Sequence, residues 1–194
     1  MAAMSEPGLH EIVLVRHGET EWSEAKKHTS TTDLPLNERG RERALTLAPK
    51  LEGLDFAAVL VSPLERARET CELAGFADRA EVSDDLFEWR YGDDEGRTTE
   101  DIRQDRPGWT VWRDGPQGGE TADEVRVRVD SVIERAANAP GNTLLFAHGH
   151  ILRALAARWI GLEISGGAHL ALETATVSRL GYERDTRVIL AWNT

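Results

Sequence analysis

The sequence predicts an α/β fold, a three-layer α/β/α sandwich with a mostly parallel sheet and a short insertion that covers a cleft. Three short runs rich in β-branched and other apolar residues are typical of buried strands: residues 11–16, 57–62 and 142–147. Helical patterns lie between and after these runs, and alternating strands and helices favour a parallel sheet. The length of 194 residues suits a single domain, 1–194, with residues 84–120 as the insertion or lid.

Two helices are expected in the first half of the chain. After the first strand, residues 23–35 form a polar loop rich in Ser and Thr. Asn37 is a typical N-cap residue, and the apolar spacing that follows it predicts a helix as far as Lys50. Ser62-Pro63 predicts the start of the next helix, with Pro63 in the first turn, where its missing N–H costs nothing.

The second half of the chain contains one ambiguous segment, residues 121–138. Val125, Val127 and Val129 alternate as in a strand, but the length and charge density of the segment favour a helix. A further helix over residues 149–159 follows the third strand. The remaining strands are expected at residues 80–83, 176–182 and 187–192.

Composition and charge exclude several classes of partner. The net charge is −11, and both nucleic acids and anionic membranes need a basic face, so neither is expected as a partner. The single cysteine, Cys71, excludes an internal disulfide and a cysteine metal cluster. Residues 1–9 are expected to be a loose leader, and no apolar run is long enough for a signal peptide or a membrane span. The expected compartment is therefore the cytoplasm.

Histidines and arginines follow the predicted strands at the points where the strands end. Arg16 ends the first strand and His17 follows it, Arg66 lies shortly after the second, and His148 follows the third. Because parallel strands place ligands at their carboxyl ends, these side chains should meet in one cleft. Converging cations bind an oxyanion, and a neutral imidazole among them is a nucleophile. The sequence therefore predicts phosphoryl transfer through a phosphohistidine.

Four segments in order resemble one known family, the histidine phosphatase superfamily of phosphoglycerate mutase-like proteins. The likeness extends from about residue 12 to about residue 159. Four segments together are a far more specific signal than Arg-His-Gly alone. The matching segments are Arg16-His17-Gly18-Glu19-Thr20, Ser62-Pro63-Leu64 followed by Arg66, Glu88 before Tyr91-Gly92, and His148-Gly149.

The resemblance implies a role for each main residue. His17 would attack phosphorus, while Glu88 would protonate the leaving group and then take a proton from water. No metal and no cofactor would be needed, because the arginines neutralise the charge. The expected substrate contacts are Arg16, Arg66, His148, Gly18, Ser23 and Thr29.

Several residues around these motifs have open roles. Residues 84–105 carry nine acids and three arginines, a balance of −6 that should repel large polyanions and favour small monoesters. The tryptophans of the insertion could line the pocket or could pin the insertion to the core. His150 is weighed as a brace for the neighbouring His148, with an ordinary structural role favoured, and His28 is expected to be an ordinary surface or loop residue. The tryptophans are Trp89, Trp109 and Trp112.

The family includes both mutases and phosphatases, and the sequence favours a phosphatase. Ser23, the pair Ser30-Thr31, and Thr99 stand where mutases carry other residues, and residues 100–120 are too short for the mutase insertion. The segments resemble the sedoheptulose-bisphosphatase branch and also broad-range bacterial acid phosphatases. The alternatives are a cofactor-dependent phosphoglycerate mutase and a non-catalytic phospholigand-binding module. The expected partner is a small phosphorylated metabolite, and edge strands could pair two copies into a homodimer.

Overall fold

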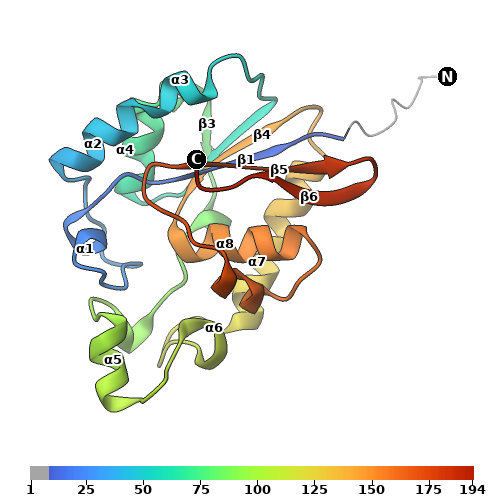
Figure 1. Cartoon of the computed structure of the whole chain (residues 1–194). Coiled ribbons are helices and arrows are strands. Elements are labelled where there is room, and N and C mark those ends of the chain that lie inside the picture. Colours follow the sequence, from blue (N-terminus) through green and yellow to red (C-terminus); the bar gives the residue numbers. More distant parts are fainter. Residues whose placement is uncertain (1–8) are drawn as a thin grey trace.

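The computed structural model describes residues 9–194, so residues 1–8 of the expected leader lie outside the described residues (Figure 1). One six-stranded sheet has the order β3-β2-β4-β1-β5-β6. The first four strands in this order pair in parallel, whereas β5 pairs antiparallel with both of its neighbours, β1 and β6. This confirms a mostly parallel sheet. The strands are β1 (Ile12–Arg16), β2 (Ala58–Val61), β3 (Ala80–Val82), β4 (Thr143–Ala147), β5 (Val177–Glu183) and β6 (Thr186–Ala191).

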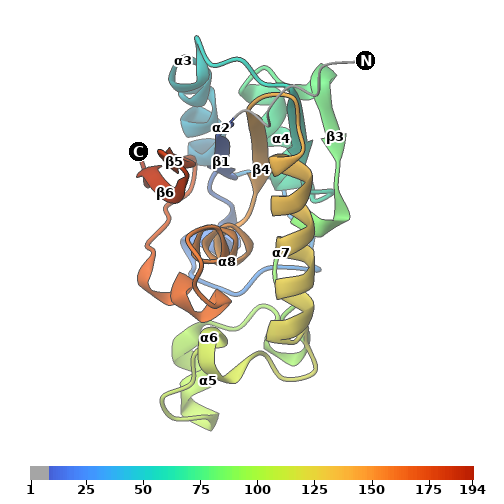
Figure 2. The same ribbon diagram turned by 90° about the vertical axis from the view of Figure 1, so that its right-hand side faces the viewer.

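Helices cover both faces of the sheet and confirm the three-layer sandwich (Figures 1 and 2). Along β1, Val13 and Val15 pack into the core on one face, while Ile12 and Leu14 pack into the core on the other. Central parallel strands are apolar on both faces because both are covered. One face carries α2 (Glu38–Leu45), α3 (Leu47–Leu51) and α4 (Glu65–Leu73), and the other carries α7 (Ala122–Ala137) and α8 (Gly149–Trp159).

The helix expected as far as Lys50 is instead two helices, α2 and α3. The break falls at Thr46, whose hydroxyl donates to the Arg43 carbonyl at 2.7 Å. Pro49 has no N–H with which to continue the ladder to the carbonyl of Leu45, so one continuous helix would leave that acceptor unpaired.

The prediction that Pro63 occupies the first helical turn is wrong. Leu64 is extended (φ −71°, ψ 138°), and α4 begins only at Glu65. The Asp33 carboxylate accepts the N–H of Glu65 at 2.8 Å and so supports the start of the helix from outside it. Pro63 therefore lies before the N-cap residue, Leu64, and outside the helix.

The ambiguous segment is a helix, α7, as predicted. Thr121 and Glu124 form a capping box at its start, which satisfies N–H groups that the helix leaves free. The buried residues have helical spacing along one side: Val125, Val129, Val132, Ile133 and Ala136.

Residues 84–120 contain only short elements, and Figures 1 and 2 show α5 and α6 beyond α8, away from the sheet. The loop after β1 pairs with this segment: Lys27 bridges Thr98, and the backbone N–H of His28 donates to the Arg97 carbonyl at 2.9 Å. The short elements of the segment are η2 (Asp84–Leu86), η3 (Gly92–Asp94), α5 (Thr99–Asp105) and α6 (Val111–Asp114). The other short helices are α1 (Glu21–Glu24), η1 (Ala77–Arg79) and η4 (Ile164–His169). Among residues 9–194, no helix combines the length and the apolar character needed to cross a bilayer.

Candidate active site

Three parallel strands end at the same edge of the sheet and gather the predicted site. Arg16 ends β1 in register with Ala147, which ends β4. The N–H of His17 donates to the Ala147 carbonyl at 3.0 Å, and the N–H of Ser62, directly after β2, donates to the Phe146 carbonyl at 2.9 Å. The rings of His17 and His148 lie 5.1 Å apart. The structure thus brings together residues that are far apart in the sequence.

His17 is held as a neutral imidazole with a defined tautomer. Its Nδ1 lies 2.6 Å from the Gly18 carbonyl oxygen, which can only accept, so Nδ1 carries the proton and the lone pair is on Nε2. Burial lowers the pKa of His17 well below 6.5, and the charges of Arg66 and Arg16 lower it further. At neutral pH the ring is therefore a nucleophile rather than a cation.

His148 and Arg66 form a fully buried pair beside His17. Both side chains are 0% exposed. Arg66 Nε donates to His148 Nδ1 at 3.2 Å, so His148 Nε2 carries the proton and donates to the Ser62 hydroxyl at 2.7 Å. The other Arg66 nitrogens donate to the carbonyls of Thr29 and Thr32. Both residues lie behind the cavity surface rather than on it, so their direct contact with phosphate stays a prediction.

Arg16 lines the cavity, and one of its buried donors has no hydrogen-bond partner among the described residues. Its Nη1 donates to the Leu172 carbonyl, but its Nε is buried and has no hydrogen-bond partner among the described residues. Burial lowers the pKa of Arg16, which reflects the cost of a charge removed from water. A buried N–H without a partner costs about 1–3 kcal/mol, and an anion in the cavity would remove that cost.

Glu88 lies buried at the amino end of α8. Its Oε1 accepts N–H groups from Trp89 and Ile151, both at 2.9 Å, and its Oε2 accepts the N–H of His150 at 3.0 Å. Two of these N–H groups belong to the first turn of α8, whose own cap residue, His148, makes no side-chain cap. A carboxylate has about four acceptor sites. One site on Oε2 is left, and Glu88 lines the cavity.

The other three of the six predicted substrate contacts, Gly18, Ser23 and Thr29, differ in position. Ser23 and Thr29 line the cavity, although the Ser23 hydroxyl also caps α1 through Thr20. Gly18 is not among the lining residues, and a Cβ there would lie 2.6 Å from the Gly40 carbonyl oxygen. A close approach of backbone to backbone therefore explains this glycine.

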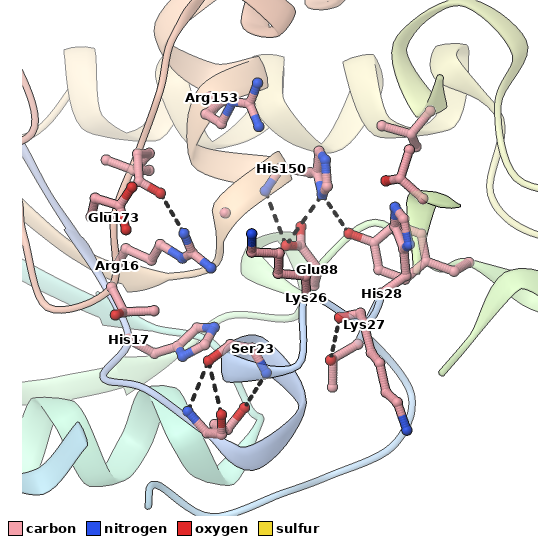
Figure 3. A pocket seen from close by; sticks show the side chains of 18 of the residues that line it. Arg16, His17, Ser23, Lys26, Lys27, His28, Glu88, His150, Arg153 and Glu173 are labelled. Carbon is pink, nitrogen blue, oxygen red and sulfur yellow. Dashed lines mark hydrogen bonds and ion pairs between the residues drawn. The ribbon is translucent and has the colours of Figure 1, made fainter. Parts of the chain in front are cut away.

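The cavity has an aromatic wall that sequence reasoning missed. His28 lies in a loop, but it is only 7% exposed, stacks on His150 at 5.9 Å and meets Tyr91 edge-on, so the expectation of an ordinary surface residue is wrong. His150 Nδ1 and the Tyr91 hydroxyl share a hydrogen bond of 2.6 Å, and Figure 3 shows His150 above Glu88. Burial lowers the pKa of His150 well below 6.5 and raises that of Tyr91, so both groups are neutral. Of these residues, only His150 could have been linked to the site from the sequence, because it lies two positions after His148 at the start of the predicted helix.

The tryptophans of the insertion divide between the two expected roles. Trp89 is 0% exposed and packs in the core cluster that includes residues of α7 and α8, so it pins the segment to the core. Its Nε1 donates to the Glu120 carbonyl at 2.8 Å, within the same segment. Trp109 and Trp112 line the cavity.

The cavity has a volume of about 510 Å³ and is lined by five cationic side chains and three carboxylates. The excess of positive charge in the cavity is the reverse of the balance in residues 84–105, because Glu88 is the one acid of that segment among the residues that line the cavity. No group of three or more metal-ligating side chains occurs in the part of the chain that the structure describes. The cations are Arg16, Lys26, Lys27, Arg103 and Arg153, and the carboxylates are Glu19, Glu88 and Glu173.

Comparison with known proteins matches residues 12–194 to the histidine phosphatase superfamily (branch 1). An acid phosphatase of Mycobacterium tuberculosis is 39% identical, over 92% of this chain and 89% of its own. The sedoheptulose 1,7-bisphosphatase of Saccharomyces cerevisiae is 34% identical, over 90% of this chain and 75% of its own.

A solved structure supports the same fold. The protein of open reading frame Rv3214 from Mycobacterium tuberculosis superposes with a TM-score of 0.91 at 36% identity, covering 95% of this chain and 97% of that one. A probable phosphoglycerate mutase of Photorhabdus laumondii is more distant, at 29% identity over 94% of this chain and 89% of its own.

Proposed function

The chain belongs to the histidine phosphatase superfamily, and we propose that it hydrolyses small phosphate monoesters through a phosphohistidine on His17. The observation that carries this proposal is the state of His17, with its Nδ1 proton bonded to the Gly18 carbonyl and its Nε2 lone pair free. Burial, Arg66 and Arg16 keep the pKa of the ring well below 6.5. A neutral nucleophile beside two fixed cations supplies what phosphoryl transfer requires.

In the first step, His17 Nε2 attacks phosphorus in line with the ester oxygen. The P–N bond forms as the P–O bond to the leaving alcohol breaks. The unpartnered Nε of Arg16 donates to a phosphoryl oxygen, and Arg66 and His148 stabilise the charge from beneath His17. Glu88 delivers a proton from Oε2 to the departing alkoxide, which leaves as the alcohol.

In the second step, water attacks the phosphorus of the phosphohistidine. Glu88 Oε2, now ionised, takes the proton of this water, and three backbone N–H donors stabilise the carboxylate while it does so. The P–N bond breaks, inorganic phosphate leaves, and His17 regains its free Nε2 lone pair. No metal or other cofactor takes part in either step.

The proposed substrates are small phosphorylated metabolites of the sugar or glycolytic type. Two relatives named as acting on phosphate monoesters, an acid phosphatase and a sedoheptulose 1,7-bisphosphatase, support this class. The cavity of about 510 Å³ is within the size range of small-molecule sites.

The decisive experiment measures phosphate release from p-nitrophenyl phosphate by the wild type, His17→Ala and His169→Ala. His169 is exposed on η4 and serves as the matched control. We expect release by the wild type and His169→Ala and a loss of at least about 10³-fold in His17→Ala. Absence of release by the wild type would instead favour a phospholigand-binding module, and equal release by all three would remove His17 as the nucleophile.

The mutase alternative is tested with 3-phosphoglycerate, with and without 2,3-bisphosphoglycerate. A phosphatase releases inorganic phosphate faster than it forms 2-phosphoglycerate. Isomerisation that outpaces phosphate release would identify a mutase.

Three further expectations stay predictions: a single domain, the cytoplasmic compartment and a homodimer. β3 and β6 are the edge strands at which two copies could pair. Limited proteolysis, cell fractionation and light scattering test the three expectations in turn.

A further inference from the structure

A hydrogen bond between Tyr91 and His150 lies beside the carboxylate oxygen of Glu88 that faces the reaction. The Tyr91 hydroxyl oxygen is 2.6 Å from His150 Nδ1, and the same Nδ1 is 3.9 Å from Glu88 Oε2. Figure 3 shows this ring nitrogen directed toward Glu88. The proposed reaction uses Oε2, but it gives no role to Tyr91 or to the ring of His150.

The Tyr91 hydroxyl determines which ring nitrogen of His150 carries the proton. Tyr91 is 1% exposed, and its hydroxyl makes no other hydrogen bond among residues 9–194. A proton on His150 Nδ1 would therefore leave the buried O–H without an acceptor, which native structures rarely tolerate. The hydroxyl donates to Nδ1, so the single proton of the neutral ring is on Nε2.

The ring of His150 is neutral and is held in position. The His28 ring stacks on it at 5.9 Å with an angle of 10° between the planes, and the Trp112 ring lies 5.2 Å away. Burial lowers the pKa of His150 well below 6.5, and the charge of Arg153 lowers it further. The titratable and charged groups around the ring are Tyr91, Glu88, His28, Arg153 and Arg16.

The position of this proton matters for Glu88. Oε2 accepts the backbone N–H of His150 at 3.0 Å, which leaves it one acceptor site. With a lone pair at Nδ1, the ring offers this site no donor, so the site stays free for a proton. A proton on Nδ1 would make the same nitrogen a donor. A shift of about 1 Å would then bring it to hydrogen-bond distance of Oε2, fill the last site and stabilise the ionised carboxylate.

We propose that Tyr91 is a positioning residue for acid catalysis by Glu88, and that it acts through His150. Its hydroxyl holds the His150 ring with the proton on Nε2, and this keeps the last acceptor site of Glu88 Oε2 for the proton that the leaving alcohol receives. The inference rests on the proposed function, in which Glu88 protonates the leaving oxygen. The ring of His150 passes no proton to the substrate.

The kinetic test compares hexyl phosphate with p-nitrophenyl phosphate in Tyr91→Phe. We expect kcat/KM for hexyl phosphate to fall about 10–100-fold, the range for a hydrogen bond to a charged group. The fall for p-nitrophenyl phosphate should be much smaller, because p-nitrophenolate leaves without a proton. In Tyr91→Phe/His150→Leu, which has no ring N–H to donate to Glu88, the ratio of the two kcat/KM values should return toward that of the wild type. This ratio does not depend on the fraction of enzyme that is folded.

Tyr182→Phe is the matched control, because Tyr182 is the other of the two tyrosines in the chain. It packs edge-on against Trp159 at 5.2 Å and does not line the cavity. Its removal should leave the ratio of the two kcat/KM values at the wild-type value.

Nitrogen-15 NMR of the histidine rings tests the same inference without turnover, because couplings to the ring protons distinguish the protonated nitrogen from the bare one. The signals of His150 are those that His150→Leu removes. We expect the proton on Nε2 in the wild type and in Tyr182→Phe, and on Nδ1 in Tyr91→Phe.

Three results would overturn the inference: a proton on Nδ1 in the wild type, an unchanged tautomer in Tyr91→Phe, or equal losses for the two esters in Tyr91→Phe. A ratio that the double variant does not restore would also overturn it, since His150 would then not carry the effect. If the wild type hydrolyses neither ester, the proposed function fails, whereas the NMR spectra still decide whether Tyr91 sets the tautomer of His150.

Discussion

The role of Glu88 as a proton donor leads to a prediction that depends on the leaving group. In Glu88→Gln, kcat/KM for an alkyl phosphate should fall about 10²–10⁴-fold, because an alkoxide is a poor leaving group without a proton. The fall for p-nitrophenyl phosphate should be much smaller, since p-nitrophenolate leaves readily as an anion. kcat/KM isolates this step, because it covers events only as far as the first irreversible one.

The structure also gives the stability cost of Glu88→Gln. The amide nitrogen must replace one carboxylate oxygen. If the amide nitrogen takes the place of Oε2, it faces one N–H donor, that of His150. If it takes the place of Oε1, it faces two, those of Trp89 and Ile151. The first orientation is therefore preferred, and one unsatisfied buried donor costs about 1–3 kcal/mol. Chemical denaturation measures this cost separately from the rate.

Glu95→Gln is the matched control for Glu88→Gln. Glu95 Oε1 accepts the N–H groups of Ser30 and Thr32, but Glu95 does not line the cavity. This variant should change kcat/KM for both substrates by the same factor. Equal losses for the two leaving groups in Glu88→Gln would refute the argument that Glu88 protonates the leaving oxygen.

Three further perturbations have defined outcomes. His17, His148 and His150 have pKa values well below 6.5, so below about pH 6.5 the unfolded chain binds protons that the folded chain does not. As the pH is lowered below 6.5, the free energy of unfolding should therefore decrease, by up to about 1.4 kcal/mol per pH unit for each imidazole. Thermal unfolding at several pH values measures this dependence, and the same dependence in His150→Gln as in the wild type would contradict it. In Ser62→Ala, the loss of the acceptor for His148 Nε2 should cost about 1–3 kcal/mol and lower kcat, as denaturation and p-nitrophenyl phosphate assays would show; unchanged stability would mean that the 2.7 Å hydrogen bond contributes little. In Gly40→Ala, a Cβ would lie 2.1 Å from a backbone oxygen of the loop after β1, so about 1–3 kcal/mol or more of stability should be lost, and a wild-type Tm would show that α2 can move aside.

The main features of the site could be predicted because each motif is local in sequence and the sheet supplies the geometry. Arg16 ends β1, and His17 and His148 directly follow β1 and β4, so parallel pairing of these two strands was enough to bring the three residues together. Glu88 lies in an irregular segment, but the same four-part motif order identified it. Of the two element boundaries that were wrong, the one before α4 depends on a single side-chain bond that no periodicity reveals, whereas Pro49 in the sequence already signals the break at Thr46.

Other features of the site depend on long-range packing and could not be predicted. His28 is buried because Tyr91 and His150, from two other segments, close around it. The burial of Arg66 behind the cavity follows from carbonyl acceptors in the loop after β1. The positive φ of Lys26 is contrary to its residue type, so local preference pointed away from it.

The central claim is that His17 carries the phosphoryl group during turnover, and trapping that species tests it most directly. The wild type is mixed with ³²P-labelled substrate, quenched in alkali after a few milliseconds and digested for mass spectrometry, because phosphohistidine survives alkali but not acid. The account predicts an acid-labile phosphate on the peptide that contains His17, absent in His17→Ala and retained in His169→Ala. Label on another residue, or substrate turnover with no labelled protein at any time point, would contradict it.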